Sequence, residues 1–290
     1  MEYLPQKIEA LVHKLMVLPW NDRDFEGVVS PTTLTNYTVW MMLAATLVVI
    51  MFVVTGRKEQ QRLALAEKSG SVADLAPAGR FVSIIEMGVE FIRNMAIDVI
   101  GPKDGPRFTA LLGTFFFLIL TSNLLGLLPG ANGISGSLGG TAALALISWL
   151  IFVWVGFAKN GFIGYFKSLI PSGVREMPLA GRIGLGGFLF LLEFIATFIV
   201  RPLTLAVRLF ANIYAGHIIL GIFSAFVWIF WPIATSKLTF SIGGAGMGAV
   251  SLLFLVLVYA FELFVAFIQA YVFTILTAVY IQSSVHASEH

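Results

Sequence analysis

Residues 198–220 read FIVRPLTLAVRLFANIYAGHIIL, an apolar stretch that nevertheless carries two arginines, Arg201 and Arg208. The guanidinium of Arg208 keeps its positive charge at any relevant pH. At the centre of a bilayer such a charge costs at least about 2.5 kcal/mol on insertion scales. The side chain therefore has to face water, protein or a counter-ion, and a charge retained at this depth is a candidate for function.

The composition of the whole chain indicates a membrane protein. Of its 290 residues, 58% are hydrophobic and 12% are charged, whereas soluble domains carry about 25% charged residues. The absence of cysteine excludes disulfides and thiolate metal sites. The net charge of +2 does not indicate nucleic-acid binding, because the basic residues lie mainly between the apolar runs. We expect an all-α integral membrane protein with a single membrane domain at 38–285.

Six segments build this domain, with about five transmembrane helices. The runs 38–55, 108–128 and 141–158 each have about the length of one membrane crossing. A hydrophilic linker at 56–80 leads to residues 81–100, whose charges at helical spacing predict an interfacial amphipathic helix. The polar N-terminal segment 1–37 is compatible with an amphipathic helix at 6–18 or with a loosely ordered tail. Residues 286–290 form the C-terminal tail.

The last two apolar runs, 183–231 and 246–283, are too long for ordinary spans. As helices they would measure roughly 50–70 Å at 1.5 Å per residue, about twice the thickness of the hydrocarbon. Each either breaks into two spans or forms one long, strongly tilted helix. If the linker is cytoplasmic and each run crosses once, twelve of the 18 Lys and Arg residues lie inside and four outside. This positive-inside bias favours single crossings, an external N-terminus and a cytoplasmic C-terminus.

The two long runs carry few polar groups, and helical spacing sorts them. Arg208 and Asn212 share a face, whereas His217 lies half a turn away from Arg208. Glu262 and Gln269 are seven residues apart and share a face of the last helix. Paired positions in antiparallel helices keep a nearly constant sum of residue numbers. An alignment that pairs Arg208 with Gln269 therefore also brings His217 close to Glu262.

These groups differ in the chemistry that they offer. An imidazole and a carboxyl group can bind and pass protons, whereas the fixed charge of Arg208 can block a cation or attract a carboxylate of another chain. Glu193, Arg201 and Gln269 are each also compatible with a purely structural role. His217 and Glu262 are too few ligands for a metal, and we expect neither a metal site nor a cofactor. No phosphate-binding loop or catalytic triad is visible, so no catalytic site is expected on this chain.

The motif from Arg201 to His217 resembles subunit a of the rotary F-type ATP synthase. The resemblance extends to NLLGLLP at 123–129 and to LFVAFIQAYVF at 263–273, and it covers most of residues 81–285. It implies that two long tilted helices curve against a ring of c subunits. It also implies that Arg208 is the essential arginine, that Gln269 faces it, that His217 and Glu262 form a pair, and that Asn212 is the polar residue one turn beyond the arginine. Glu193 lies near a family acid, but its spacing to Arg201 is one residue longer than usual.

The resemblance further implies a proton-conducting stator subunit of the Fo sector. Two half-channels would serve the c-ring carboxylates: an outer one lined by His217, Glu262 and Asn212, and an inner one beside Glu193, with Arg208 separating them. The expected partners are the c-ring, the b subunit of the peripheral stalk, the rest of the F1Fo complex and the lipid bilayer, but no nucleic acid. The expected location is a bacterial plasma membrane. H⁺ and Na⁺ both stay open as the coupling ion.

Two other functions compete with this interpretation. A stand-alone secondary transporter usually shows internal repeats, and none is visible in the chain. A non-conducting membrane scaffold would not need charged and titratable groups within its apolar helices, because each such group is costly there.

Overall fold

The computed structural model describes residues 36–69, 79–128, 136–169, 179–235 and 242–285. The described part is helical and contains no strand. Its elements are α2 (Asn36–Ser69), α3 (Arg80–Ile100), α4 (Gly105–Gly126), α5 (Leu138–Asn160), α6 (Phe162–Ser168), α8 (Leu179–Ile195), the π-helical segment η4 (Ala196–Val200), α9 (Arg201–Thr235) and α10 (Ile242–Val285).

Within the described ranges, five helical stretches are long and apolar enough to cross a membrane. They are Val39–Arg62, Gly105–Gly126, Leu138–Asn160, Gly184–Phe230 and Gly246–Val285. The all-α membrane fold with about five spans is therefore confirmed. The amphipathic N-terminal helix proposed at 6–18 and the tail at 286–290 lie outside the described residues.

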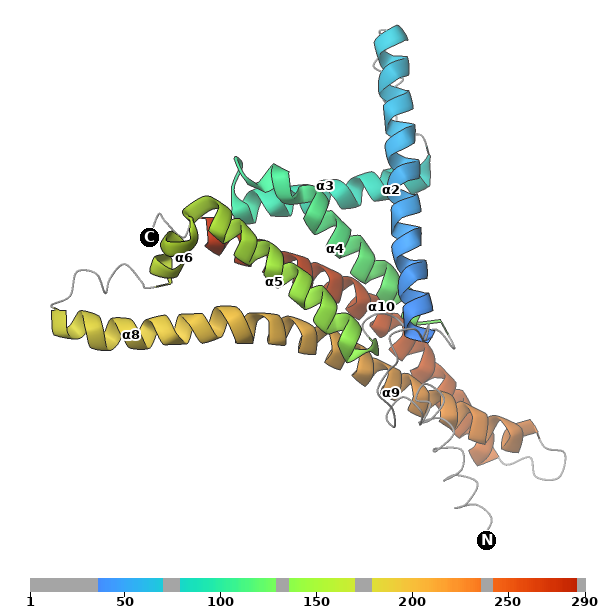
Figure 1. The fold of residues 1–290 in the computed structure, drawn as a ribbon. Coiled ribbons are helices and arrows are strands. Elements are labelled where there is room, and N and C mark those ends of the chain that lie inside the picture. Colours follow the sequence, from blue (N-terminus) through green and yellow to red (C-terminus); the bar gives the residue numbers. More distant parts are fainter. Residues whose placement is uncertain (1–35, 70–78, 129–135, 170–178, 236–241, 286–290) are drawn as a thin grey trace.

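The two long apolar runs are each continuous rather than split by a turn. Figure 1 shows α8, η4 and α9 as one gently curved rod, whose α9 end runs beside α10. The 44 residues of α10 correspond to about 66 Å at 1.5 Å per residue. A helix of this length fits a bilayer only when it is strongly tilted.

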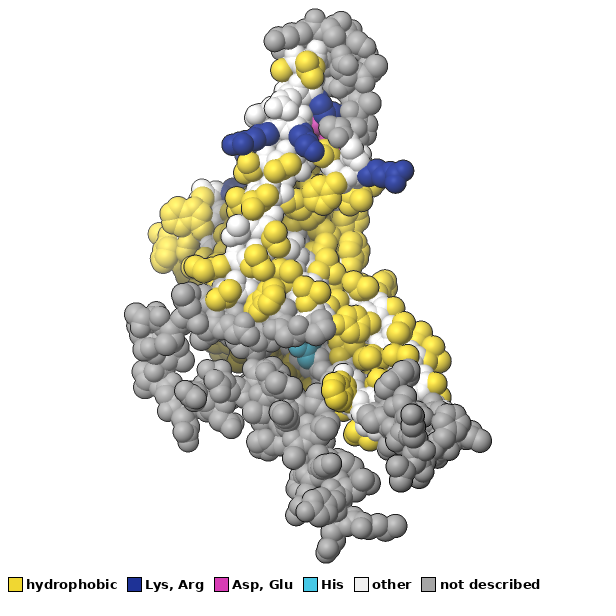
Figure 2. All heavy atoms as spheres, turned by 90° about the vertical axis from the view of Figure 1, so that its right-hand side faces the viewer, with side chains coloured by type: hydrophobic (Ala, Val, Ile, Leu, Met, Phe, Trp, Pro, Cys, Tyr) yellow, Lys and Arg dark blue, Asp and Glu magenta, His cyan; other side chains and the backbone are white. Residues whose placement is uncertain are grey.

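The first part of the predicted hydrophilic linker is helical and continues the first span as far as Ser69. Its residues 57–68 are mostly Arg, Lys, Glu, Gln, Leu and Ala, which have high helix propensity. Arg62 forms ion pairs with Glu59 at 2.6 Å and with Glu86 of α3 at 2.8 Å. In Figure 2, basic side chains gather over this end of the molecule, beyond a belt of hydrophobic side chains. The charge distribution fits a membrane boundary crossed by α2.

A core formed by α3, α4, α5 and α10 supports the long helices. Phe115 of α4 packs edge-on against Phe273 of α10, with ring centroids 5.5 Å apart. The fully buried hydroxyl groups of Ser148 and Thr277 hydrogen-bond at 3.0 Å and join α5 to α10. In the most apolar 18-residue stretch of α8–α9, only 11% of the residues are buried inside the chain, and in that of α10 only 17%. The corresponding share in α4 is 44%. The long pair is thus fixed on one side and uncovered on the other.

Candidate functional site

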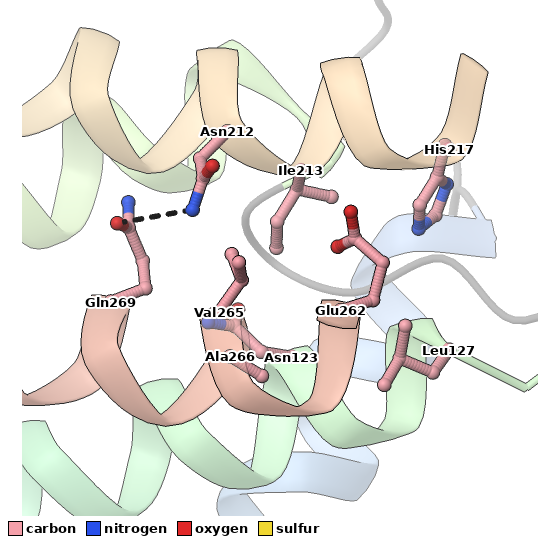
Figure 3. Close-up of a pocket in the computed structure, with 9 residues that line it drawn as sticks. All are labelled: Asn123, Leu127, Asn212, Ile213, His217, Glu262, Val265, Ala266 and Gln269. Carbon is pink, nitrogen blue, oxygen red and sulfur yellow. Dashed lines mark hydrogen bonds between the residues drawn. The ribbon is translucent and has the colours of Figure 1, made fainter. Parts of the chain in front are cut away.

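A polar pocket lies between α4, α9 and α10, where the two long helices run antiparallel (Figure 3). We use the term pocket cluster for its polar members Asn123, Asn212, His217, Glu262 and Gln269. The apolar residues that line the same pocket are Leu127, Ile213, Val265 and Ala266. Five polar side chains from three helices therefore meet inside a membrane protein, where each needs a partner or water.

Gly216 allows α10 to approach α9 at the pocket. A Cβ atom added to Gly216 would overlap the carboxyl group of Glu262. Glu262 itself is buried, and within the described part of the chain its carboxyl group accepts no hydrogen bond. In Figure 3 this carboxyl group points toward α9, between Ile213 and His217. The glycine thus makes the space in which an unpaired acid is held beside an imidazole.

The end of α4 closes this side of the pocket. The imidazole of His217 lies near the backbone of Gly126, and the hydroxyl of Tyr259 on α10 donates to the carbonyl of Leu127. Both long helices therefore lie against the same turn at the end of α4, and α10 is anchored to it by a hydrogen bond.

Gln269 links the pocket to the backbone at Arg208. Its amide nitrogen donates to the carbonyl oxygen of Arg208 at 2.9 Å, and its amide oxygen accepts from the Asn212 amide at 3.3 Å. The alignment of Arg208 with Gln269 and of His217 with Glu262 along the helices is as predicted. The contact of Gln269, however, is with the backbone of Arg208 rather than with its guanidinium.

The guanidinium of Arg208 lies on the uncovered face of α9. Arg208 is exposed, and so are Ala211, Ala215 and Ile219, which lie within about 60° of it around the helix axis. Within the part of the chain that the structure describes, Arg208 belongs to no ion pair. An unpaired charge in the middle of an apolar helix face needs a counter-ion from outside the chain.

Glu193 and Arg201 form a second polar group, which does not reach the pocket. Arg201 donates to the Glu193 carboxylate at 2.6 Å, and its guanidinium lies 5.2 Å from the ring centroid of Tyr280 on α10. We call these three residues the ion-pair cluster. Along α9, Arg208 lies between Arg201 of this cluster and Asn212 of the pocket cluster. The predicted site residues are thus divided into two groups on either side of Arg208.

Asn123, Tyr280 and Trp149 were not predicted as site residues. Asn123 is buried in the pocket, and its position as an amide near the end of an apolar span was the available signal. Tyr280 and Trp149 look like ordinary aromatic residues of apolar helices, so their contacts with Arg201 and with Thr197 could not be read from the sequence. Among the described residues, no group of three or more His, Asp or Glu residues could hold a metal ion.

Comparison with known proteins shows to which protein family the chain belongs. The family model described as ATP synthase A chain matches residues 38–282. ATP synthase subunit a of Hyphomonas neptunium is 35% identical over 286 residues, covering 96% of this chain and 97% of the relative. The subunit a of Nitrobacter hamburgensis is 36% identical over 252 residues (87% and 88%), and that of Rhodococcus erythropolis is 38% identical over 221 residues (74% of both chains).

Proposed function

This chain belongs to the ATP synthase A chain family, and on that premise we propose that it is the proton-conducting stator subunit of the Fo sector, with Arg208 separating two half-channels. The observation that carries the proposal is the position of Arg208. It is exposed and without an ion-pair partner in the described chain, on an apolar helix face between two polar clusters. A c-ring carboxylate fits this face as the missing counter-ion.

The pocket cluster is proposed as the lining of the outer half-channel. His217 and Glu262 supply two groups that can exchange protons, and Asn212 and Gln269 supply amides that can hydrogen-bond water or the moving carboxyl group. The amides also fix the geometry of α9 against α10. Protons taken up here would neutralise a carboxylate of a c subunit.

Arg208 would prevent a direct leak between the two half-channels. A neutral carboxyl group can pass through lipid during rotation, whereas an ionised one cannot without a large desolvation cost. On meeting Arg208, the ionised form is stabilised by the adjacent positive charge, and the proton is released. Each proton that moves down 100 mV releases about 2.3 kcal/mol, so several must pass for each ATP that the catalytic sector makes.

The ion-pair cluster is proposed to lie beside the inner half-channel. Glu193 is only partly buried, with 42% of its side chain exposed, which fits a carboxylate in contact with water. Arg201 at 2.6 Å keeps this carboxylate in one place. We propose that the N-terminus is external and the C-terminus cytoplasmic, in a bacterial plasma membrane, with the c-ring and the b subunit as partners.

Reconstitution of the complete F1Fo complex in vesicles tests this function. We expect Arg208→Lys to abolish ATP-driven acidification and ATP synthesis, because a lysine cannot reproduce the planar, always charged guanidinium. Wild-type coupling in this variant would refute the assignment. Acidification in Na⁺-free buffer identifies H⁺ as the coupling ion. Ion flux through vesicles that hold this chain alone would instead support a stand-alone transporter.

A further inference from the structure

The helix is not uniformly α-helical between Glu193 and Arg201. Residues Ala196–Val200 form a π-helical segment, and the backbone N–H of Arg201 bonds the carbonyl of Ala196, five residues back. A π turn contains one residue more than an α turn, because its bonds close at i+5 rather than i+4. Such single turns are frequently found at functional sites.

The π segment accounts for the contact between Glu193 and Arg201. In a regular α-helix, residues eight apart differ by about 80° around the axis, whereas residues seven apart nearly coincide. The extra residue held in the π turn compensates for the eight-residue spacing, so Glu193 and Arg201 share a face and pair at 2.6 Å. The side chains of Glu193 and Arg201 therefore meet because of a local irregularity of the backbone.

The same irregularity leaves a buried carbonyl group without a backbone donor. Continuing the pattern of Ala196 and Arg201, the carbonyl of Thr197 would accept from residue 202, which is a proline and has no N–H. Thr197 is fully buried, so water does not replace this bond. The indole N–H of Trp149 on α5 donates to the Thr197 carbonyl at 3.2 Å instead.

From this geometry we propose that Trp149 is a positioning residue for Glu193. Its indole N–H takes the place of the missing N–H of Pro202, stabilises the π turn, and so holds Glu193 on the face of Arg201. The functional part of this inference rests on the proposed role of Glu193 beside the inner half-channel. The structural part stands on the contacts of Trp149 alone.

Trp149→Phe is the sharpest substitution, because it removes the donor and keeps an aromatic ring. The Trp149 ring packs edge-on against Phe198 of the π segment with centroids 5.7 Å apart, a contact that a phenyl ring can preserve in part. Pro202→Ala supplies the backbone N–H that the native helix lacks at this position. Trp154→Phe is the matched control, because Trp154 is on the same helix, is 73% exposed, and makes no hydrogen bond through its indole in the described chain.

The experiment measures the helix position and the transport in the same assembled complex. This chain has no cysteine, so thiol-reactive spin labels modify it only at Phe188→Cys on α8 and Leu150→Cys on α5. These two positions are exposed. Rotation of α8 by one residue corresponds to about 100° around the helix axis, which moves the label at residue 188 by several ångströms.

We expect Trp149→Phe to shift or broaden the distance distribution and to lower ATP-driven acidification about three- to tenfold, in line with a buried carbonyl that has lost its partner. Adding Pro202→Ala should restore both, and Trp154→Phe should change neither. An unchanged distance distribution in Trp149→Phe, or a failure of Pro202→Ala to restore it, overturns the inference. A shifted distribution with wild-type transport keeps Trp149 as the support of the π turn and refutes the proposed role of Glu193.

Discussion

Two polar clusters lie on either side of Arg208, and they are held in different ways. In the pocket cluster, neutral amides hydrogen-bond one another and the backbone, and the buried Glu262 carboxyl group has no ion-pair partner among the residues that the structure describes. In the ion-pair cluster, the Glu193 carboxylate is more exposed and is paired with Arg201 at 2.6 Å. An acid within an apolar helix can therefore be kept either by enclosure, as for Glu262, or by a counter-charge, as for Glu193. Of these two acids, Glu262 is the one with no fixed charge beside it in the described part of the chain.

The largest contrast is expected from removing each acid. Glu262→Gln should lower ATP-driven acidification about a hundredfold, the lower end of what a positioned proton-transfer group contributes. Glu193→Gln should lower it less, because 42% of the Glu193 side chain is exposed and, in the proposed inner half-channel, water can take over part of its role. Initial acidification rates of vesicles holding the complete complex measure both. Equal losses would remove the functional distinction between the two clusters.

Gly216→Ala is expected to disturb only the pocket cluster. The added methyl group would overlap the Glu262 carboxyl group, which is the end of a flexible side chain and can move away while the helices stay packed. We therefore expect acidification to fall about tenfold or more, within the effect of losing the proton-transfer group itself, with normal assembly. Gly221→Ala is the matched control on the same helix, because no atom lies within 4 Å of its added Cβ. A normal rate in Gly216→Ala would mean that the position of the carboxyl group is not critical.

Arg201→Lys tests what the ion-pair cluster requires. A lysine keeps the positive charge beside Glu193 but loses the planar group that lies over Tyr280. A cation–π contact at a partly exposed site contributes about 0.5–1 kcal/mol, so we expect a two- to fivefold lower acidification rate. Arg201→Gln removes the charge as well and should be clearly worse. If the two variants behave alike, the charge of residue 201 is irrelevant and the cluster is held by other contacts.

Sequence reasoning could predict the relation between α9 and α10 because it depends on helical spacing alone. The alignment of Gln269 with Arg208 and of Glu262 with His217 follows from two periodic patterns and an antiparallel arrangement. The contact of Gln269 with the backbone of Arg208 could not be predicted, because helical spacing does not say which atoms of two facing residues meet. The closure of the pocket by Asn123 and Leu127 could not be predicted either, because it depends on where α4 packs.

The π segment shows a different limit of sequence reasoning. The one-residue excess between Glu193 and Arg201 is visible in the sequence as a departure from the family spacing. How a helix absorbs an extra residue depends on what can satisfy the displaced carbonyl groups. Here that partner is Trp149, which is 48 residues away in the sequence from Thr197.

Another ion pair joins Asp104, just before the span Gly105–Gly126, to Lys159 at the end of the span Leu138–Asn160. It provides a comparison for the ion-pair cluster, and the smallest effect is expected here. Lys159 donates to Asp104 at 3.0 Å, and this hydrogen bond holds the pKa of the Asp104 carboxyl group below its usual value. The stabilisation is present at neutral pH and is lost as the pH falls through this lowered pKa. Because 43% of the Lys159 side chain is exposed, we expect Asp104→Asn to destabilise the detergent-solubilised complex by only about 0.2–1 kcal/mol, and the difference from wild type to vanish in acid. Thermal unfolding at neutral pH and at a pH below the lowered pKa of Asp104 measures this. A larger loss of stability than Glu193→Gln causes in the same unfolding assay would mean that the membrane environment does not strengthen the Glu193–Arg201 pair.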